Sequence, residues 1–349
     1  MKIGNKNFLT IWHNEDDESV SIIDQTKLPF EFIVKKLKKY DDGFDAIKKM
    51  LVRGAPLIGA TAAYSLYLAA KEDENIDYIL DKADHIKTAR PTAVNLAWAA
   101  DRIIENLDKT NLKNSILHEC KKICLEDIKI CEDIGEHGLD VIKNLNKKEI
   151  NILTHCNAGW LATIDWGTAT APIYKARDHG FKINVWVDET RPRNQGSSLT
   201  SYELLNENIE HKVIADNTGG LLMQKGMVDL CIVGTDRVSL NGDVANKIGT
   251  YLKALAAKDN NVPFYVALPS TTFDKSISSG KEIPIEERSD DELKYFSGVD
   301  ENGDIKKINI YAEGAKGFNL GFDITPANLV TGFITEKGVF KPDKLKEVF

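Results

Sequence analysis

Two potentially reactive side chains directly follow apolar runs that are typical of buried strands. Cys156 comes after residues 150–154, and Asp236 comes after residues 230–233. A thiol at the N-terminus of a helix can have a lowered pKa and become reactive, although a buried structural cysteine is the simpler interpretation. A carboxyl group in a closed apolar site can stay protonated and act as an acid, whereas Asp236 could also cap a turn or pair with Arg237. The neighbouring His155 is not automatically the base for Cys156, because consecutive strand residues point to opposite faces.

Two arginines precede prolines that can start helices, and each arrangement suits an anion. Arg53 lies before the amides of Gly54 and Ala55, which precede Pro56, and Arg90 stands directly before another proline. Proline is favoured in the first turn of a helix, where free N–H groups and the helix dipole attract phosphate. Arginine adds a two-pronged charged donor. The alternative is that the prolines only start helices and the arginines are solvated.

The elements that would position these residues fall into two parts. Residues 1–145 read mainly as helices, with helical apolar spacing in the stretches 44–52, 57–70, 93–107 and 113–145. From residue 146 on, short β-like runs alternate with helical stretches, which is typical of a parallel sheet covered on both faces. We therefore predict an α/β fold, with a mainly helical N-terminal domain (1–145) and a Rossmann-like, doubly wound parallel-sheet domain (146–349).

Within the second part, strands are expected at 150–154, 183–187, 212–215, 230–233 and 264–268, and helices at 159–179, 199–206, 221–225 and 245–258. Each strand ends in polar or small residues, and open parallel sheets bind ligands beyond the carboxyl ends of their strands. The helix over 245–258 would place Asn246 and Lys247 at its start, where they could bind hydroxyl or phosphate groups or simply be solvated. Cys120, Cys124 and Cys131 share one helical stripe, which we interpret as core rather than as metal ligands.

Composition narrows the class of protein. The chain has 349 residues, 45 basic and 53 acidic, for a net charge of −8, which argues against a general nucleic-acid binder. It contains neither an apolar run long enough to span a bilayer nor an apolar signal-peptide core at the N-terminus. The five cysteines show no framework spacing, so a reduced, cytoplasmic protein is expected. Neither nucleotide-binding fingerprints nor zinc motifs occur, so we expect no metal and no organic cofactor.

A set of short segments, in a fixed order, resembles the methylthioribose-1-phosphate isomerase family, which lies in the wider family of the regulatory subunits of the eukaryotic guanine-exchange factor for translation initiation. The resemblance covers nearly the whole chain. The segments are VRGAP (52–56), RPT (90–92), HCNAG (155–159), ETRP (189–192), QG (195–196), DN (216–217), GTDR (234–237), NGDVANKIGT (241–250) and IPIEERS (283–289). Thr235 and Trp160 depart from residues that are common in the family, and both bear on substrate preference.

The resemblance implies isomerisation of 5-methylthioribose 1-phosphate to 5-methylthioribulose 1-phosphate, a step of methionine salvage. It implies that Asp236 is the proton donor, that Cys156 is the other catalytic group, and that the sugar phosphate is bound by Arg53, Gly54, Ala55, Arg90, Gln195, Asn246 and Lys247. Cys156 would be a base or relay in a phosphoenolate route, or it would only shape a dry pocket for a hydride shift.

The alternatives that stay open are the same reaction on 5-deoxyribose 1-phosphate, a ribose 1,5-bisphosphate isomerase, and a regulatory subunit that binds a sugar phosphate or nucleotide without turnover. A hydrophobic pocket discriminates a small group such as methylthio by only about 1–3 kcal/mol. The resemblance also implies a homodimer, formed through the α/β half.

Overall fold

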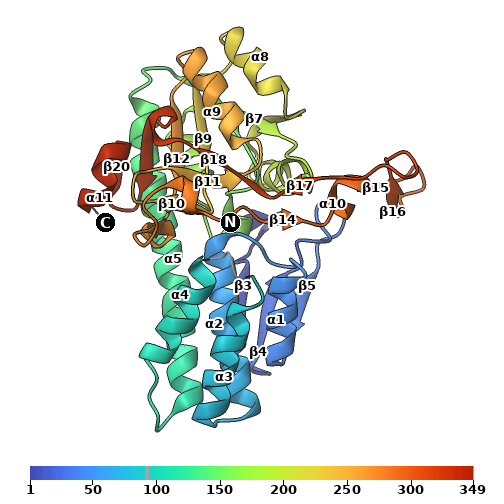
Figure 1. Cartoon of the computed structure of the whole chain (residues 1–349), viewed down its shortest axis with the longest axis vertical. Helices are drawn as coiled ribbons and strands as arrows, with labels where there is room; N and C mark the ends of the chain where they lie inside the picture. The colour runs from blue at the N-terminus through green and yellow to red at the C-terminus, as the bar shows by residue number, and fades with distance from the viewer. Residues whose placement is uncertain (91–93, 349) are drawn as a thin grey trace.

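The computed structural model describes residues 1–90 and 94–348, and Figure 1 shows a bundle of helices below an α/β layer structure. The first 37 residues form strands, which the helical interpretation of this region missed. A three-stranded antiparallel sheet has the order β3-β4-β5, and its central strand is fully buried because alternating Ser and β-branched residues pack on both faces. The strands are β1 (Lys2–Ile3), β2 (Lys6–Asn7), β3 (Ile11–Asn14), β4 (Ser19–Ile23) and β5 (Val34–Leu37).

Within residues 1–90 and 94–145, five α-helices complete this part of the molecule. The second is apolar nearly all round and is buried along most of its length, as predicted for residues 57–70. The fifth helix is 32 residues long and packs against both the second helix and the large sheet, so it joins the two parts. Cys120 and Cys124 lie in the helical core, and all five cysteines are free and buried. The helices are α1 (Tyr40–Lys48), α2 (Ala55–Glu72), α3 (Ile76–Lys87), α4 (Val94–Glu105) and α5 (Leu112–Lys143).

The second part is built on a seven-stranded sheet in the order β20-β19-β12-β9-β6-β7-β8. All its pairs are parallel except β19 with β20. This is the doubly wound arrangement that the β/α rhythm predicts. The strands are β6 (Glu149–Thr154), β7 (Lys182–Asp188), β8 (Glu210–Ile214), β9 (Leu230–Val233), β12 (Phe264–Ala267), β19 (Gly332–Thr335) and β20 (Gly338–Phe340).

Helices cover both faces of this sheet. Ile150 and Ile152 face the core shared with α5 and α6 (Ala171–Asp178), whereas Leu153 faces the core shared with α8 (Thr218–Gln224) and α9 (Thr250–Asp259). Successive residues along each strand therefore pack into the two cores on opposite faces of the sheet. The chain leaves β6 toward β7 on one side and returns to β9 on the other, so β6 and β9 flank the point at which the winding reverses.

Two predicted helices were partly wrong. Residues 159–179 form a short 3-10 turn (Trp160–Ala162) and a loop before α6, because Gly167, at a φ of 78°, interrupts the helix. Residues 244–247 form β11 (Val244–Lys247) instead of a helix start, and α9 begins only after Gly249, which has a φ of 102°. Asn246 and Lys247 are therefore strand residues. β11 belongs to a four-stranded sheet with β10 (Arg237–Ser239), β13 (Phe273–Asp274) and β18 (Phe322–Thr325).

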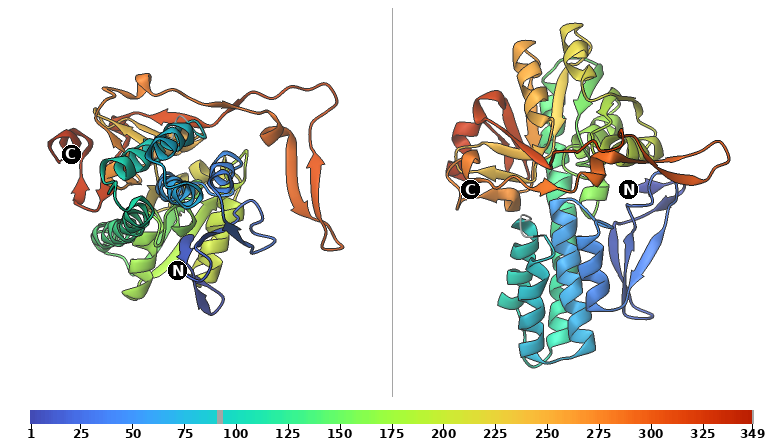
Figure 2. Two further views of the ribbon diagram at one scale, coloured as in Figure 1. Left: turned by 90° about the horizontal axis from the view of Figure 1, so that it is seen from below. Right: turned by 45° about the vertical axis from the view of Figure 1, so that its right-hand side comes forward.

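A two-stranded hairpin projects from the α/β part, as both views of Figure 2 show. It consists of β15 (Tyr295–Val299) and β16 (Ile305–Asn309), and it follows α10 (Asp291–Lys294). The remaining elements are α7 (Ser201–Asn206), β14 (Glu287–Arg288), β17 (Asn319–Leu320) and α11 (Leu345–Val348). Among the described residues, none of the helices is both long and apolar enough to cross a membrane. We propose that the boundary between the two domains lies between residues 145 and 146, in the segment that joins α5 to β6.

Candidate active site at the carboxyl ends of β6 and β9

Cys156 and Asp236 come together because the strands that precede them are neighbours. Cys156 lies two residues after β6, Asp236 lies three residues after β9, and these two strands pair in parallel. Their carboxyl ends therefore open on the same edge of the sheet, at the point where the winding reverses. Asp236 is half-buried, and its amide donates to the carbonyl oxygen of Ala245 on β11, so β11 forms the adjoining wall.

Cys156 is a buried thiol held in an unusual backbone conformation. Its φ is 67°, a left-handed conformation that costs a residue with a Cβ about 1–2 kcal/mol, and Thr190 and Thr200 bind its amide and its carbonyl group. The Sγ atom donates to Oε1 of Gln195, 3.5 Å away. Burial raises the pKa of the thiol, although the charges of Arg53 and Lys247 lower it. Cys156 is thus buried, as its simpler interpretation holds, and a loop and the 3-10 turn Trp160–Ala162 follow it in place of an α-helix.

Arg53 and Gly54 lie at the start of α2, as the Pro56 pattern predicted. Gly54 has a φ of 88°, and a Cβ on it would lie 2.3 Å from the carbonyl oxygen of Ala162. Only glycine fits this close approach, which brings the first turn of α2 against the loop that follows Cys156. Arg53 uses its Nη2 to donate to the main-chain oxygen of Asn157 at 2.6 Å, and its Nη1 also donates to the Oδ1 of Asn157.

Arg90 is a mostly buried cation with a distant counter-ion. Its Nη2 lies 3.9 Å from Oε2 of Glu286, an oxygen that is itself buried without a hydrogen bond. Burial lowers the pKa of Arg90, and the neighbouring charges of Arg288 and Arg53 act in the same direction. Glu286 and Asp236 act in the opposite direction. Among the described residues, Glu286 is the ion-pair partner of Arg90 and lies 3.9 Å away, and a buried cation with so long a contact is suited to an anionic ligand. The expected proline-started helix at residues 91–93 lies outside the described residues, and α4 is described from Val94.

Asn246 and Lys247 reach the site from β11. Lys247 is buried, and its Nζ donates to the carbonyl oxygen of Gly321 at 2.9 Å and lies 4.7 Å from the centre of the Phe322 ring. Burial lowers the pKa of Lys247, whereas Cys156 and Asp236 act to raise it. Asn246 is also buried, and its Nδ2 donates to the hydroxyl oxygen of Thr250 at 3.0 Å.

The charged groups of the site lie close enough to act on one another's pKa values. Arg53 and Lys247 lower the pKa of Cys156 and Asp236 raises it, whereas Arg288 and Arg53 lower the pKa of Arg90 and Asp236 raises it. Arg288, which the sequence reasoning did not single out, is thus an additional cation of the group. The signal that could have found it was its position within the segment 283–289, which also supplies Glu286.

Two cavities open on this group. One, of about 460 Å³, is lined by Arg53, Gln195 and residues of α10 and the β15–β16 hairpin. The other is smaller and lies beside Gly54, Arg90 and Asp236. Its remaining wall is mainly apolar and consists of Ile58, Ala245, Ile283, Pro284, Ile285 and Phe322, together with Arg237 and Ala55. The site therefore offers a polar, cationic side and an apolar side.

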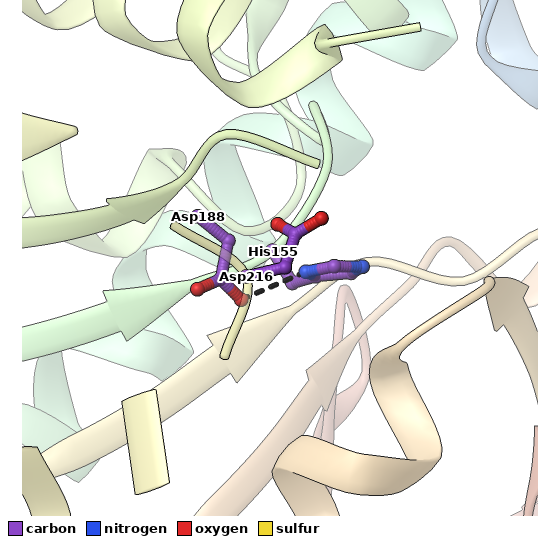
Figure 3. Close-up of side chains that lie close together, drawn as sticks. All are labelled: His155, Asp188 and Asp216. Carbon is purple, nitrogen blue, oxygen red and sulfur yellow. Dashed lines mark hydrogen bonds and ion pairs between the residues drawn. The ribbon is translucent and has the colours of Figure 1, made fainter. Parts of the chain in front are cut away.

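A cluster next to the site has the residue types of a metal centre. His155, Asp188 and Asp216 lie close together (Figure 3), and their ligand atoms are within 4.8 Å of one another. However, His155 pairs with Asp188 at 2.8 Å through Nδ1 and donates through Nε2 to the carbonyl oxygen of Ile248. Asp188 also lies 3.2 Å from Nζ of Lys253, and both oxygens of Asp216 accept backbone amides. These partners are typical of a buried ion-pair network. Both ring nitrogens of His155 are thus engaged by Asp188 and Ile248.

Fold and site together define a class: a Rossmann-like α/β protein with a helical N-terminal part, whose cationic site lies at the reversal point of the sheet. Known proteins of this class were found by comparison. The profile of the Initiation factor 2 subunit family matches residues 51–342. A methylthioribose-1-phosphate isomerase of Paramagnetospirillum magneticum is 55% identical, over 100% of this chain and 99% of that protein.

Two solved structures are similar to this chain over nearly its whole length. A 5-methylthioribose 1-phosphate isomerase from Pyrococcus horikoshii has a TM-score of 0.84 and 38% identity, covering 98% of this chain and 95% of the other. A translation initiation factor eIF-2B delta subunit from A. fulgidus has a TM-score of 0.81 and 39% identity, with 98% of both chains covered. The chain belongs to the initiation factor 2 subunit family, and within it to the methylthioribose-1-phosphate isomerases.

Proposed function

We propose that the protein isomerises 5-methylthioribose 1-phosphate to 5-methylthioribulose 1-phosphate, a step of methionine salvage, at the site formed by Cys156 and Asp236. The observation that carries the proposal is that Asp236 and the buried thiol of Cys156 follow two strands that pair in parallel, with Arg90 and Asp236 lining one pocket and Arg53 and Gln195 lining the cavity of about 460 Å³. An acid placed among cations suits a phosphorylated sugar whose ring must be opened. The close relatives that carry this activity in their names support the choice of substrate.

The cationic side would hold the phosphate. Arg53, just before α2, and Arg90, just after α3, provide charged donors, and the amides of Gly54 and Ala55 lie at the start of α2, where the helix dipole is positive. Gln195, Asn246 and Lys247 would bind the sugar hydroxyls and orient the ring. Phosphate and reacting carbons would then lie between the helices and the carboxyl ends of β6 and β9.

The substrate poses a specific chemical difficulty, because phosphate on the anomeric oxygen prevents spontaneous opening to a free aldehyde. Asp236 would donate a proton to the ring oxygen as the bond between this oxygen and C1 breaks, which leaves positive charge on C1. A hydrogen then passes from C2 to C1, and the ionised Asp236 takes the proton of the C2 hydroxyl group as the ketone forms. Oxidation at C2 balances reduction at C1, and Asp236 ends protonated, so the reaction draws on no external redox partner.

Burial of Cys156 favours transfer of that hydrogen as a hydride. A base in a phosphoenolate route must start as a thiolate, whereas the thiol here donates to Gln195 and its pKa is raised by burial. A hydride shift needs no base at C2. Cys156 would then contribute an apolar, water-free wall beside the cation at C1.

One assay tests this proposal against its alternatives. Purified protein is given 5-methylthioribose 1-phosphate, 5-deoxyribose 1-phosphate and ribose 1,5-bisphosphate, and kcat/KM is measured for each. We expect the highest value for the methylthio sugar, because Ile58, Ile283, Ile285 and Phe322 line an apolar pocket beside Asp236. Preference for the bisphosphate would contradict the substrate assignment, and no turnover of any of the three would support a regulatory, binding protein.

We also propose that the protein is a homodimer formed through the α/β half. The β15–β16 hairpin supports this, since Ile305 and Ile308 are exposed on a strand that pairs with only one neighbour. Exposed apolar edge strands tend to pair with another chain. Sedimentation equilibrium should give a dimer mass for the natural chain and a lower mass for Ile308→Lys. A monomeric natural chain would contradict the proposal.

A further inference from the structure

We propose that Glu203, on α7, is a positioning residue that holds the side-chain amide of Asn157, and through it the guanidinium group of Arg53, in the orientation that receives the substrate phosphate. This inference rests on the proposed function for the identity of the ligand. It concerns a carboxyl group that lies behind the site, on the far side of Asn157 from Arg53.

Asn157 is the immediate contact of Arg53. The two terminal nitrogens of Arg53 donate to the side-chain and main-chain oxygens of this one residue. A guanidinium group carries five N–H donors. Within the part of the chain that the structure describes, Nε and the second hydrogens of Nη1 and Nη2 therefore stay available for a ligand in the adjoining cavity of about 460 Å³, which Arg53 lines. The direction in which Arg53 presents these donors therefore depends on where Asn157 holds it.

The amide of Asn157 can hold Arg53 in only one of its two orientations. Its Oδ1 must face the guanidinium group, because the flipped amide would bring two sets of donors together. In the observed orientation Nδ2 donates to Oε1 of Glu203 at 2.9 Å and to Oγ1 of Thr200 at 3.2 Å. Since Glu203 supplies the shorter of these contacts and is fully buried, it is the principal acceptor that selects the orientation.

Glu203 is itself fixed from several sides. The amide of Leu161 donates to Oε1 at 2.9 Å, and the hydroxyl group of Tyr174 on α6 donates to Oε2 at 3.3 Å. A Cβ on Gly159 would lie 1.6 Å from Oε2, so the glycine of the HCNAG segment leaves the room that this carboxyl group occupies. A side chain at Gly159 would therefore collide with Glu203, so the loop after Cys156 can hold this carboxyl group only with glycine at position 159.

To orient Asn157, Glu203 needs a side chain long enough to place an acceptor oxygen beside Nδ2, and it does not need a negative charge. An oxygen at the position of Oε1 accepts from Asn157 and Leu161 whether the carboxyl group is neutral or ionised. Burial raises the pKa of Glu203 to about 7, although Asn157, Leu161, Arg53 and Tyr174 each lower it, so neither form dominates near neutral pH. Glutamine keeps this acceptor at the same distance, whereas aspartate keeps the charge and withdraws the oxygens by one methylene group.

The test compares Glu203→Gln with Glu203→Asp in the full-length protein, after circular dichroism has shown that each variant is folded. We expect Glu203→Asp to raise KM for 5-methylthioribose 1-phosphate roughly 10-fold, as for a weakened charged contact, with a smaller change in kcat. Glu203→Gln should stay near the natural KM. Equal values in all three proteins, or a larger loss for glutamine than for aspartate, would overturn the proposal.

Calorimetric titration with inorganic phosphate separates this inference from the proposed function. Natural protein that fails to turn over the sugar contradicts the proposed function alone. The positioning role then requires phosphate affinity to fall in Glu203→Asp and Arg53→Ala and to be kept in Glu203→Gln. Phosphate affinity that is the same in Glu203→Asp as in the natural protein would overturn the inference.

Discussion

The thiol of Cys156 donates a hydrogen bond to Oε1 of Gln195 across 3.5 Å. Burial raises the pKa of this thiol, because the thiolate would lose its solvation. This relationship is why the proposed chemistry assigns proton transfer to Asp236 and gives Cys156 a part in excluding water.

Substitutions of Cys156 should separate the two roles of the thiol. We expect Cys156→Ala to keep more activity than Cys156→Ser, because alanine leaves the wall apolar and serine brings a hydroxyl group that attracts water. The measurement is kcat on 5-methylthioribose 1-phosphate at saturating substrate. If alanine is as inactive as serine, or more so, the sulfur takes part in proton transfer and the phosphoenolate route is favoured.

Asp236→Asn should lower kcat by roughly 10²–10⁴-fold, which is the usual worth of a positioned acid–base group. The fold should stay intact, because the backbone contact of this residue, its amide to Ala245, does not involve the carboxyl group. Asp259→Asn, at the exposed end of α9, is the matched control and should be fully active. Activity of Asp236→Asn within a few-fold of the natural enzyme would remove Asp236 from the mechanism.

Arg90→Ala should raise KM for the sugar phosphate roughly 10- to 100-fold, because it removes a charged donor from a partly desolvated site. Arg102→Ala is the control, since Arg102 pairs with Glu119 and Glu126 in the helical part, and its KM should not change. Steady-state kinetics at constant ionic strength measures both. A rise in KM of the same size in both variants would mean that general folding damage, and not phosphate binding, explains the effect.

Stability should fall as the pH rises from 5 to 8. Burial raises the pKa of Asp127 and of Glu203 to about 7 in the folded protein, whereas unfolded carboxyl groups titrate near pH 4. The stabilisation is therefore complete below about pH 4 and is lost as the pH rises through about 7, by up to about 1.4 kcal/mol per pH unit for each group.

Asp127→Asn should weaken this pH dependence and leave KM unchanged. Asparagine can still accept from the amide of Ile164, which binds Asp127 at 2.8 Å, and it does not ionise. Urea unfolding at pH 5, 6, 7 and 8 gives the free energy of unfolding of both proteins. Parallel curves for the variant and the natural chain would show that Asp127 is not one of the groups responsible.

The sequence predicts those parts of the site that form through residues close together in the chain, and it misses those that form through pairing of distant segments. Gly54 and Pro56 mark the start of α2 through their own backbone preferences, and β6 and β9 follow from apolar runs between polar ends. Asn246 and Lys247 were wrongly assigned to a helix, because the apolar spacing of residues 245–258 hides a strand that is formed only by pairing with β10 and β18.

Glu203 shows what sequence reasoning missed and why. Its partners are Asn157, Leu161 and Tyr174, which are 29 to 46 residues away in the chain, so no local pattern displays them. The available signal was an acid four residues after Leu199 and next to Leu204, on the apolar face of the predicted helix. A buried carboxyl group at such a position requires specific polar partners.

The proposed site moves hydrogen from C2 to C1 of 5-methylthioribose 1-phosphate, and an NMR assay in ordinary water with substrate deuterated at C2 follows this hydrogen directly. We expect the natural protein to form 5-methylthioribulose 1-phosphate that carries the deuterium at C1, and Asp236→Asn to lose this product. Failure to form the ketose would contradict the activity, and ketose with deuterium washed out to the solvent would contradict the hydride shift.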